Sequence, residues 1–422
     1  ATNTYNTAVG ANAGNQVTTG IRNTLIGGIA GDSLTDADYN TAIGFDALGT
    51  DTLGSGSVAI GYQALERQNF VTATTSYNVA VGYNTGENIT TGLRNTILGG
   101  LAGDALTDAD DNVALGMDAL SADTLGSKTV AIGKGALNVQ NFTTATNTYN
   151  TAVGYQAGTA VSTGVRNTLI GGLSGDAITT GIRNTTLGYF SGGSFDVGSY
   201  NVAVGDNALA TDSKGSTAVA IGYGTLASQN FTTATNNYNI GIGYNAGSAV
   251  TTGTINTLIG GLSGDALTEG NSNVAVGYGS LTSDTKGDLN VAIGQLALSA
   301  QNFTTSTDSY NTAVGSNAGQ GVTTGAQNTL IGGIAGDALT NSNYNTAVGY
   351  SSLSADTLGA RNTAIGQEAL ASQNFTTATD SYNTAVGMNA GRLISTGLQN
   401  TLIGGLAGDA LTGNGFSGAT RT

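Results

Sequence analysis

A five-residue motif that recurs at two fixed spacings constrains the fold of this chain more than any other feature. It reads most often Asn, Thr or Val, Ala or Leu, Val or Ile, Gly, and it occurs 23 times in 422 residues. Successive copies begin 17 residues apart, except at five steps of 21. Such an internal repeat indicates a solenoid, in which each repeat forms one coil that stacks on the next. The five longer steps begin at Ser57, Thr129, Ala218, Asn290 and Asn362.

The residue types at each motif position predict a short β-strand. The fifth position is Gly in every copy, the fourth is Val, Ile or Leu, and the second is Thr, Val or Ile. β-Branched residues two positions apart lie on one face of a strand and favour that conformation. The invariant glycine predicts a bend or a close backbone approach, because glycine freely adopts positive φ. Three residues later only Ala, Ser or Thr occurs, as at Ala30 and Thr85, which predicts a narrow interior corner.

These patterns predict an all-β fold, a parallel β-solenoid of about 23 coils of 17 or 21 residues. A helical solenoid is the competing interpretation, but apolar spacings of three and four are missing, and Gly, Asn and Thr fill the intervals. The absence of proline fits, since every coil must donate backbone N–H groups to the next. We expect residues 1–422 to form one continuous repeat domain, a segment of a longer fibre protein.

Two recurring polar features have predicted structural roles. Asn opens 20 of the 23 copies and is expected to form a ladder inside a turn, its amide bonded to the amides above and below. Each longer coil contains Gln-Asn-Phe, and its four extra residues should bulge out. These loops are candidate contact points for a carbohydrate or a partner; in the alternative, which we favour, each Phe folds back over its coil. The five phenylalanines are Phe70, Phe142, Phe231, Phe303 and Phe375.

The third motif position leads to a prediction of self-association. If the second and fourth side chains face the coil interior, the third faces outward, yet it is Ala in most copies. Strands that are apolar on both faces are normally covered on both. An exposed apolar stripe of this length would exceed what soluble monomers usually show, so we expect a homo-oligomer, with threefold closure suiting a narrow stripe. Larger apolar residues of this predicted oligomer stripe are Leu25, Ile97, Leu169, Leu258, Leu330 and Leu402.

The motif resembles the head repeats of trimeric autotransporter adhesins, and similar repeats occur in phage tail-fibre proteins. The resemblance is carried by segments such as Asn-Thr-Ala-Val-Gly-Tyr-Gln-Ala-Gly at 150–158 and Asn-Val-Ala-Ile-Gly-Gln-Leu-Ala-Leu at 290–298, and it extends over essentially the whole chain. It implies a left-handed parallel β-roll in which three chains pack around an axis. The coils of 17 and 21 residues are longer than those of the adhesin heads.

Composition argues against most catalytic and nucleic-acid-binding functions. The chain has no Cys or His, so it cannot form disulfides, thiolate zinc sites or nucleophiles that depend on an imidazole base. Its net charge is −15 with only 12 scattered basic residues, which disfavours nucleic-acid partners. No apolar run approaches the roughly 18 residues of a membrane-spanning helix. We therefore expect no enzymatic activity, no catalytic residue and no cofactor.

Two groups of aspartates are the remaining candidates for chemistry. Asp36 and Asp38 suggest calcium, but the matching positions of a later repeat are Asn341 and Asn343, so we expect no metal site. A second Asp follows Gly at regular intervals and is expected to cap a solvated turn, because sugar hydrolysis needs two carboxyls in one cleft. This Gly-Asp column comprises Asp32, Asp104, Asp176, Asp265, Asp337 and Asp409.

The sequence favours a structural fibre or adhesin repeat region, a rigid shaft or head on a virion or cell surface that serves reach and multivalent attachment. Its expected partners are further copies of the chain and a surface carbohydrate or host receptor. The alternative is the building block of a self-assembling extracellular filament or matrix. Ice binding is a third interpretation, but Val or Ile interrupts the second-position Thr column at nine coils, and that column is expected to face inward.

Overall fold

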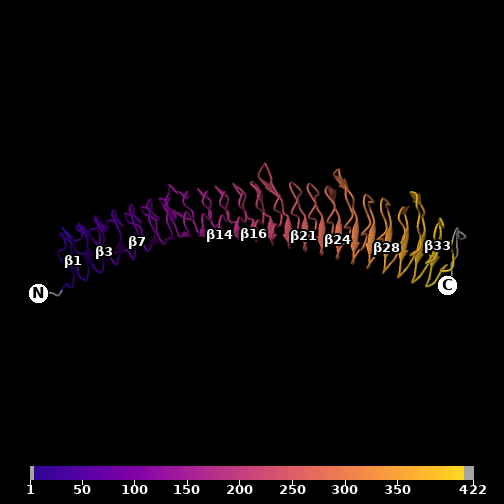
Figure 1. Cartoon of the computed structure of the whole chain (residues 1–422), viewed down its shortest axis with the longest axis horizontal. Helices are drawn as coiled ribbons and strands as arrows, with labels where there is room; N and C mark the ends of the chain where they lie inside the picture. The colour runs from indigo at the N-terminus through magenta and orange to yellow at the C-terminus, as the bar shows by residue number, and fades with distance from the viewer. Residues whose placement is uncertain (1–3, 413–422) are drawn as a thin grey trace. The chain divides into compact units, whose positions relative to one another are not determined.

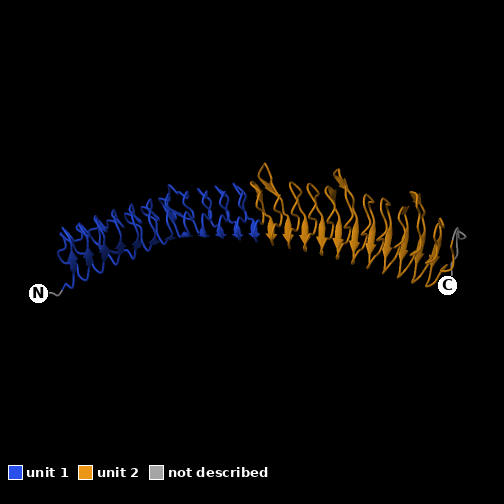
Figure 2. Ribbon diagram, viewed as in Figure 1, with its two compact units in different colours: residues 1–207 blue, residues 208–422 orange. Residues whose placement is uncertain are grey.

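The computed structural model describes residues 4–412, which fold as a parallel β-solenoid with no helix among them. The chain divides into two compact units, residues 1–207 and 208–422 (Figure 2). Within each unit, successive coils lie side by side with their strands pointing the same way (Figure 1). No helix that could cross a membrane occurs in the described part of the chain.

The described part of unit 1, residues 4–207, contains twelve three-residue strands, each formed by the second to fourth positions of one motif copy. Neighbouring strands stack motif on motif, so that Ala152 of β13 lies opposite Leu169 of β14. The strands are β1 (Thr7–Val9), β2 (Thr24–Ile26), β3 (Thr41–Ile43), β5 (Val58–Ile60), β7 (Val79–Val81), β8 (Thr96–Leu98), β9 (Val113–Leu115), β11 (Val130–Ile132), β13 (Thr151–Val153), β14 (Thr168–Ile170), β15 (Thr185–Leu187) and β16 (Val202–Val204).

Between residues 208 and 412, unit 2 contains eleven strands of the same kind. The register is the same across the longer steps, since Ala292 of β24 lies opposite Ala313 of β26, 21 residues later. The predicted solenoid of about 23 stacked motifs is therefore confirmed. The strands are β18 (Val219–Ile221), β20 (Ile240–Ile242), β21 (Thr257–Ile259), β22 (Val274–Val276), β24 (Val291–Ile293), β26 (Thr312–Val314), β27 (Thr329–Ile331), β28 (Thr346–Val348), β30 (Thr363–Ile365), β32 (Thr384–Val386) and β33 (Thr401–Ile403).

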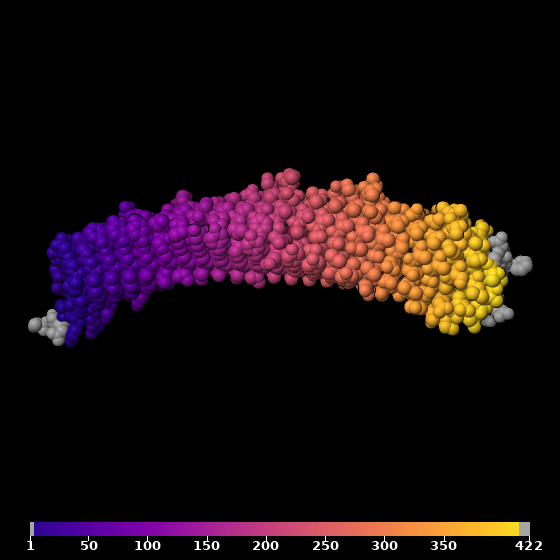
Figure 3. Space-filling view, in the orientation of Figure 1, coloured from indigo at the N-terminus to yellow at the C-terminus, as the bar shows by residue number. Residues whose placement is uncertain are grey.

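Each longer coil forms an additional pair of two-residue strands with the coil that precedes it. Three exposed residues precede the second strand of every pair, at 71–73, 143–145, 232–234, 304–306 and 376–378. The predicted bulge is therefore present, and in unit 2 the longer loops rise above the neighbouring coils in Figures 1 and 3. The pairs are β4 (Gly54–Ser55) with β6 (Thr74–Thr75), β10 (Gly126–Ser127) with β12 (Thr146–Asn147), β17 (Gly215–Ser216) with β19 (Thr235–Asn236), β23 (Gly287–Asp288) with β25 (Thr307–Asp308), and β29 (Gly359–Ala360) with β31 (Thr379–Asp380).

The motif glycine is required by both its backbone angle and its surroundings. Gly171 has a φ of +130°, and a Cβ placed on it would lie 2.3 Å from the carbonyl oxygen of Gly188 in the next coil. No side chain fits at such a distance, so the coils stack at this corner only because every copy ends in Gly. The prediction of a close backbone approach is confirmed. The narrow corner is confirmed as well, since Ala30 and Thr85 are fully buried.

The prediction that the third motif side chain faces outward is wrong. The second and fourth side chains lie half-exposed on the outer face, while the third is buried inside the coil of its own chain. All residues of the predicted oligomer stripe are at most 1% exposed: Leu25, Ile97, Leu169, Leu258, Leu330 and Leu402. These residues form the core of the solenoid and present no surface to another chain.

Space inside the coil explains this orientation. A large third-position residue occurs only where Gly stands eight residues after the motif's first residue, in its own coil and in the preceding one. Leu169, for example, fills the space beside Gly158 and Gly175, where added Cβ atoms would come within 2.6 and 2.8 Å of its methyl groups. In the coil of the small third residue Ala42, the position of the glycine carries Leu48 instead, and both are fully buried. The two positions thus share one core volume.

A pair of adjacent glycines tests whether backbone stacking at the motif corner holds the fold together. Gly99→Ala should lower the free energy of unfolding by about 3 kcal/mol, because the new Cβ would lie 2.6 Å from the carbonyl carbon of Gly116 at a φ of +128°. Gly100→Ala is the matched control, since its Cβ would lie 3.9 Å from its nearest neighbour. Thermal unfolding followed by circular dichroism measures both. Equal loss in the two variants would contradict the stacking argument.

Candidate interaction surfaces

The outer sheet face is formed by the second and fourth motif positions, and it is uncharged, with Val, Ile or Leu in every fourth position and Thr, Val or Ile in every second position. No charged residue occupies either position in any of the 23 copies. Parallel strands with apolar residues on both faces are usually covered on both. The fourth-position side chains that are more than a third exposed are Val9, Ile26, Leu115 and Leu187 in unit 1, and Ile221, Ile293, Ile331, Ile365 and Ile403 in unit 2.

The second-position Thr column also lies on this outer face, so the expectation that it points inward is wrong. Thr24 and Thr41 in neighbouring strands are both half-exposed. Val or Ile still interrupts this column at nine coils, whichever way the column faces. The interruptions argue against an ordered Thr array for ice binding.

A second surface is formed by the residue directly before each motif, which we call the turn column. All 23 of its residues have positive φ, and Tyr or Arg occupies 14 of the positions. Cations of the column stack on its tyrosine rings: Arg22 lies 5.2 Å from the ring centre of Tyr39, and Arg183 lies 5.3 Å from that of Tyr200. Such contacts are favourable because a cation is attracted to the face of an aromatic ring.

A third surface lies directly after the motif glycine, where exposed aromatic rings stack between coils. Phe45 and Tyr62 have ring centres 5.7 Å apart, and Tyr62 and Tyr83 have theirs 5.3 Å apart. Sequence reasoning missed both aromatic columns. The signal was present, because Tyr recurs immediately before and immediately after the motif, as at Tyr149 and Tyr155.

The Asn that opens the motif has the predicted structural role, with a different main partner. Asn167 accepts a hydrogen bond on Oδ1 from the backbone N–H of Asn184 in the next coil, and its Nδ2 donates to the carbonyl of Gly181; both distances are 2.9 Å. Direct amide-to-amide bonds occur as well, as from Asn400 Nδ2 to Asn383 Oδ1 at 3.0 Å. The amide therefore serves mainly to satisfy buried backbone groups, which needs both a donor and an acceptor.

The Gln-Asn-Phe segments of the longer coils build a buried polar network. In the first, Asp51 accepts hydrogen bonds from Gln68 Nε2 at 2.6 Å and from the backbone N–H groups of Gly54 and Phe70. Gln68 in turn accepts a bond from Asn78 Nδ2 at 2.9 Å. Burial raises the pKa of the Asp51 carboxyl. In each of the other longer coils the Gln side chain likewise donates to an Asp carboxylate and accepts a bond from an Asn amide; these residues are Gln140, Gln229, Gln301 and Gln373.

The phenylalanines of these segments cover their coils, as the favoured alternative predicted. Their exposed fractions are between 5 and 7% for Phe70, Phe142, Phe231, Phe303 and Phe375. The rings themselves are therefore not contact points. The surface of each longer loop is instead the exposed Thr- and Ala-rich tip that follows the Phe, as at residues 143–145 and 232–234.

Asp36 and Asp38, the predicted calcium candidates, accept hydrogen bonds from the preceding coil. Asp38 Oδ1 accepts a bond from the backbone N–H of Ile21 at 2.7 Å, and Asn343 Oδ1 accepts one from Ala326 at the same distance. Only an oxygen acceptor is needed, which explains why Asp and Asn alternate in this column. Within residues 4–412 there is no group of three or more Asp or Glu side chains placed to hold a metal ion.

The Gly-Asp column is less solvated than predicted. Asp104 is half-buried, its Oδ1 has no hydrogen-bond partner, and burial with nearby Glu87 and Asp118 raises its pKa to about 6. Burial likewise raises the pKa of Asp32, Asp176 and Asp337. Backbone N–H groups beside these carboxyls fit the predicted capping role.

Asp104 makes stability depend on pH. Between the ordinary pKa of 3.8 and about 6, the folded chain binds more protons than the unfolded chain, so stability falls as pH rises through this range. Asp104→Asn should leave stability unchanged at pH 3.5 and raise it by about 1 kcal/mol at pH 7, after allowance for solvent screening. Denaturant unfolding at both pH values measures the effect. The exposed Asp308→Asn is the control, and an Asp104→Asn variant that loses stability at pH 7 would contradict the assignment.

No protein-family model matches the chain, and no curated protein matches it.

Proposed function

We propose that this chain is the repeat region of a structural fibre or adhesin, a rigid shaft or head that extends from a virion or a cell surface and serves multivalent attachment. The observation that carries the proposal is the unbroken motif-on-motif register of the strands within each unit, including across the longer coils. Such stacking gives a stiff column whose surface features repeat at fixed intervals. Weak contacts repeated along it add through effective concentration.

The proposal includes a homo-oligomer, with the trimer implied by the adhesin resemblance as its expected form. The surface assigned to self-association is now the outer sheet face, since the third-position side chains are buried within the chain. A second copy is the best-matched cover, because this face has no charged residue and repeats along the unit, so two copies can align strand for strand. Burial of exposed Ile and Val side chains would drive the association.

The proposal assigns no catalytic role to the chain. Asp38 accepts a bond from a backbone N–H group, and Asp51 accepts one from the Gln side chain of its longer coil, so both have structural partners. An extracellular location agrees with the proposed role in attachment. The exposed tips of the longer loops recur along each unit and are proposed as points where a surface carbohydrate or a host receptor makes repeated contacts.

Light scattering coupled to size-exclusion chromatography tests the oligomer. We expect a discrete mass three times that of the chain. The double variant Ile331→Lys, Ile365→Lys should shift the protein to a monomer, because both residues are 38% exposed on the outer sheet face and paired copies would bring like charges together. Lysine suits this test, since its aliphatic stem still covers neighbouring apolar surface.

The matched control is Thr304→Lys, Thr376→Lys, which adds the same charge to exposed loop tips away from the outer sheet face. This control should keep the wild-type mass, and circular dichroism should report folded protein in both variants. A monomeric wild type would contradict the proposed oligomer. Open-ended polymers would contradict the discrete fibre and favour the filament alternative.

A further inference from the structure

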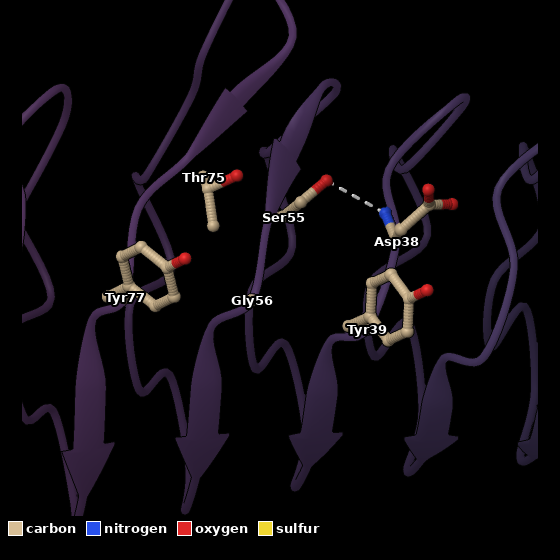
Figure 4. Close-up of a pocket in the computed structure, with 6 residues that line it drawn as sticks. All are labelled: Asp38, Tyr39, Ser55, Gly56, Thr75 and Tyr77. Carbon is tan, nitrogen blue, oxygen red and sulfur yellow. Dashed lines mark hydrogen bonds between the residues drawn. The ribbon is translucent and has the colours of Figure 1, made fainter.

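The turn column contains one gap, and the gap is a lined pocket. At Gly56 the column has no side chain, while the rungs on either side carry Tyr39 and Tyr77, both more than half exposed. The two rings flank the glycine in Figure 4. Two rungs separate them, about 9.6 Å at the usual strand spacing. The pocket has a volume of about 390 Å³ and is lined by Asp38, Tyr39, Ser55, Gly56, Thr75 and Tyr77.

The same slot occurs again in unit 2, where a side chain fills it. Arg361 stands in the place of Gly56, between Tyr344 and Tyr382, and its guanidinium carbon lies 4.6 Å from one ring centre and 5.7 Å from the other. The guanidinium group is thus held between two tyrosine faces. It also forms an ion pair with Asp380, at 3.2 Å.

The backbones of the two slots match. Gly56 N–H donates to the carbonyl of Asp38 at 3.0 Å, and Arg361 N–H donates to that of Asn343 at 3.1 Å. The φ angles are +74° at Gly56 and +63° at Arg361, so both residues have left-handed conformations. The filled slot therefore indicates what the open slot can accommodate, which is one planar cation between two rings.

The net charge of the chain favours a cationic ligand. Asp38 lines the open slot, but its Oδ1 accepts a bond from the N–H of Ile21 in the preceding coil, and its carboxylate points away from Gly56 (Figure 4). The nearest cation on the column, Arg22, stacks on Tyr39 from the preceding rung and so lies outside the slot. A chain of net charge −15 attracts cations generally. A sugar could also stack between the rings, but the filled slot in unit 2 holds a cation.

We propose that the slot formed by Tyr39, Gly56 and Tyr77 binds the guanidinium group of an arginine presented by another polypeptide. The two rings would provide cation–π contacts on both faces. Thr75 stands in the place that Asp380 takes beside Arg361, so the rings and not an ion pair would hold the ligand. This site would give the proposed fibre a contact that does not depend on the outer sheet face or on the loop tips.

Saturation-transfer NMR with Nα-acetylarginine amide as the probe tests the proposal at low ionic strength. We expect transfer to the side-chain protons of the probe in the wild type, and at least a fivefold loss in Gly56→Arg, in which the new side chain fills the slot as Arg361 does. Arg361→Gly should open a second slot and about double the transfer. Tyr77→Leu removes one ring without filling the slot, so it should also weaken the transfer to the probe. This second variant keeps the test valid even if Gly56→Arg does not fold.

Equal transfer in the wild type and in Gly56→Arg would overturn the site, as would no transfer at all. Methyl glucoside and N-acetylglucosamine are the neutral comparisons, and a signal from either that disappears in Gly56→Arg, with none from the arginine probe, would overturn the assigned chemistry. The oligomeric mass of Gly56→Arg distinguishes the sources of the arginine. A mass below that of the wild type assigns the arginine to a second copy, and an unchanged mass assigns it to a different polypeptide.

Discussion

Backbone stacking at the motif glycine is the constraint on which the rest of each unit depends. Coils approach so closely there that a Cβ on Gly171 would lie 2.3 Å from the carbonyl oxygen of the next coil. Inter-coil hydrogen bonds flank this corner, from Gly171 N–H back to Val153 and from Thr168 N–H forward to Asn184, both at 2.8 Å. Once the backbone is held in this register, each position of the repeat lies over the same position of the next coil.

This register turns sequence periodicity into columns of like chemistry. Buried Asn amides satisfy the backbone groups that the turns leave unpaired, and apolar residues fill a core only one coil wide. On the surface the same rule produces an apolar face, a column of tyrosines and cations, and loop tips at the longer coils. A change in one residue of a column, such as Gly56 between Tyr39 and Tyr77, alters the surface locally because the coils on either side keep their side chains.

Sequence reasoning succeeded where a pattern had one structural solution and failed where it had two. The fold, the register, the glycine corner and the covering role of Phe70 each followed from residue type and spacing. The face of the strand that points into the core did not follow from them, because a short strand with apolar residues at all three positions can pack with either face inward. The sizes of paired residues would have decided which face is buried. Leu169 occurs with Gly175, and Ala42 with Leu48, so each pair must share one interior volume.

By itself, the sequence determined that the motifs stack, since an invariant glycine and β-branched neighbours at constant spacing leave few other ways to satisfy the backbone. The tertiary structure alone decided which face is the core, because that depends on how narrow the closed coil is. It also decided that the carboxylate of Asp51 is buried against Gln68, and that Tyr39 and Tyr77 flank an open slot. The members of these two pairs are 17 and 38 positions apart in the sequence, and only the path of the chain around each coil sets the distances between them.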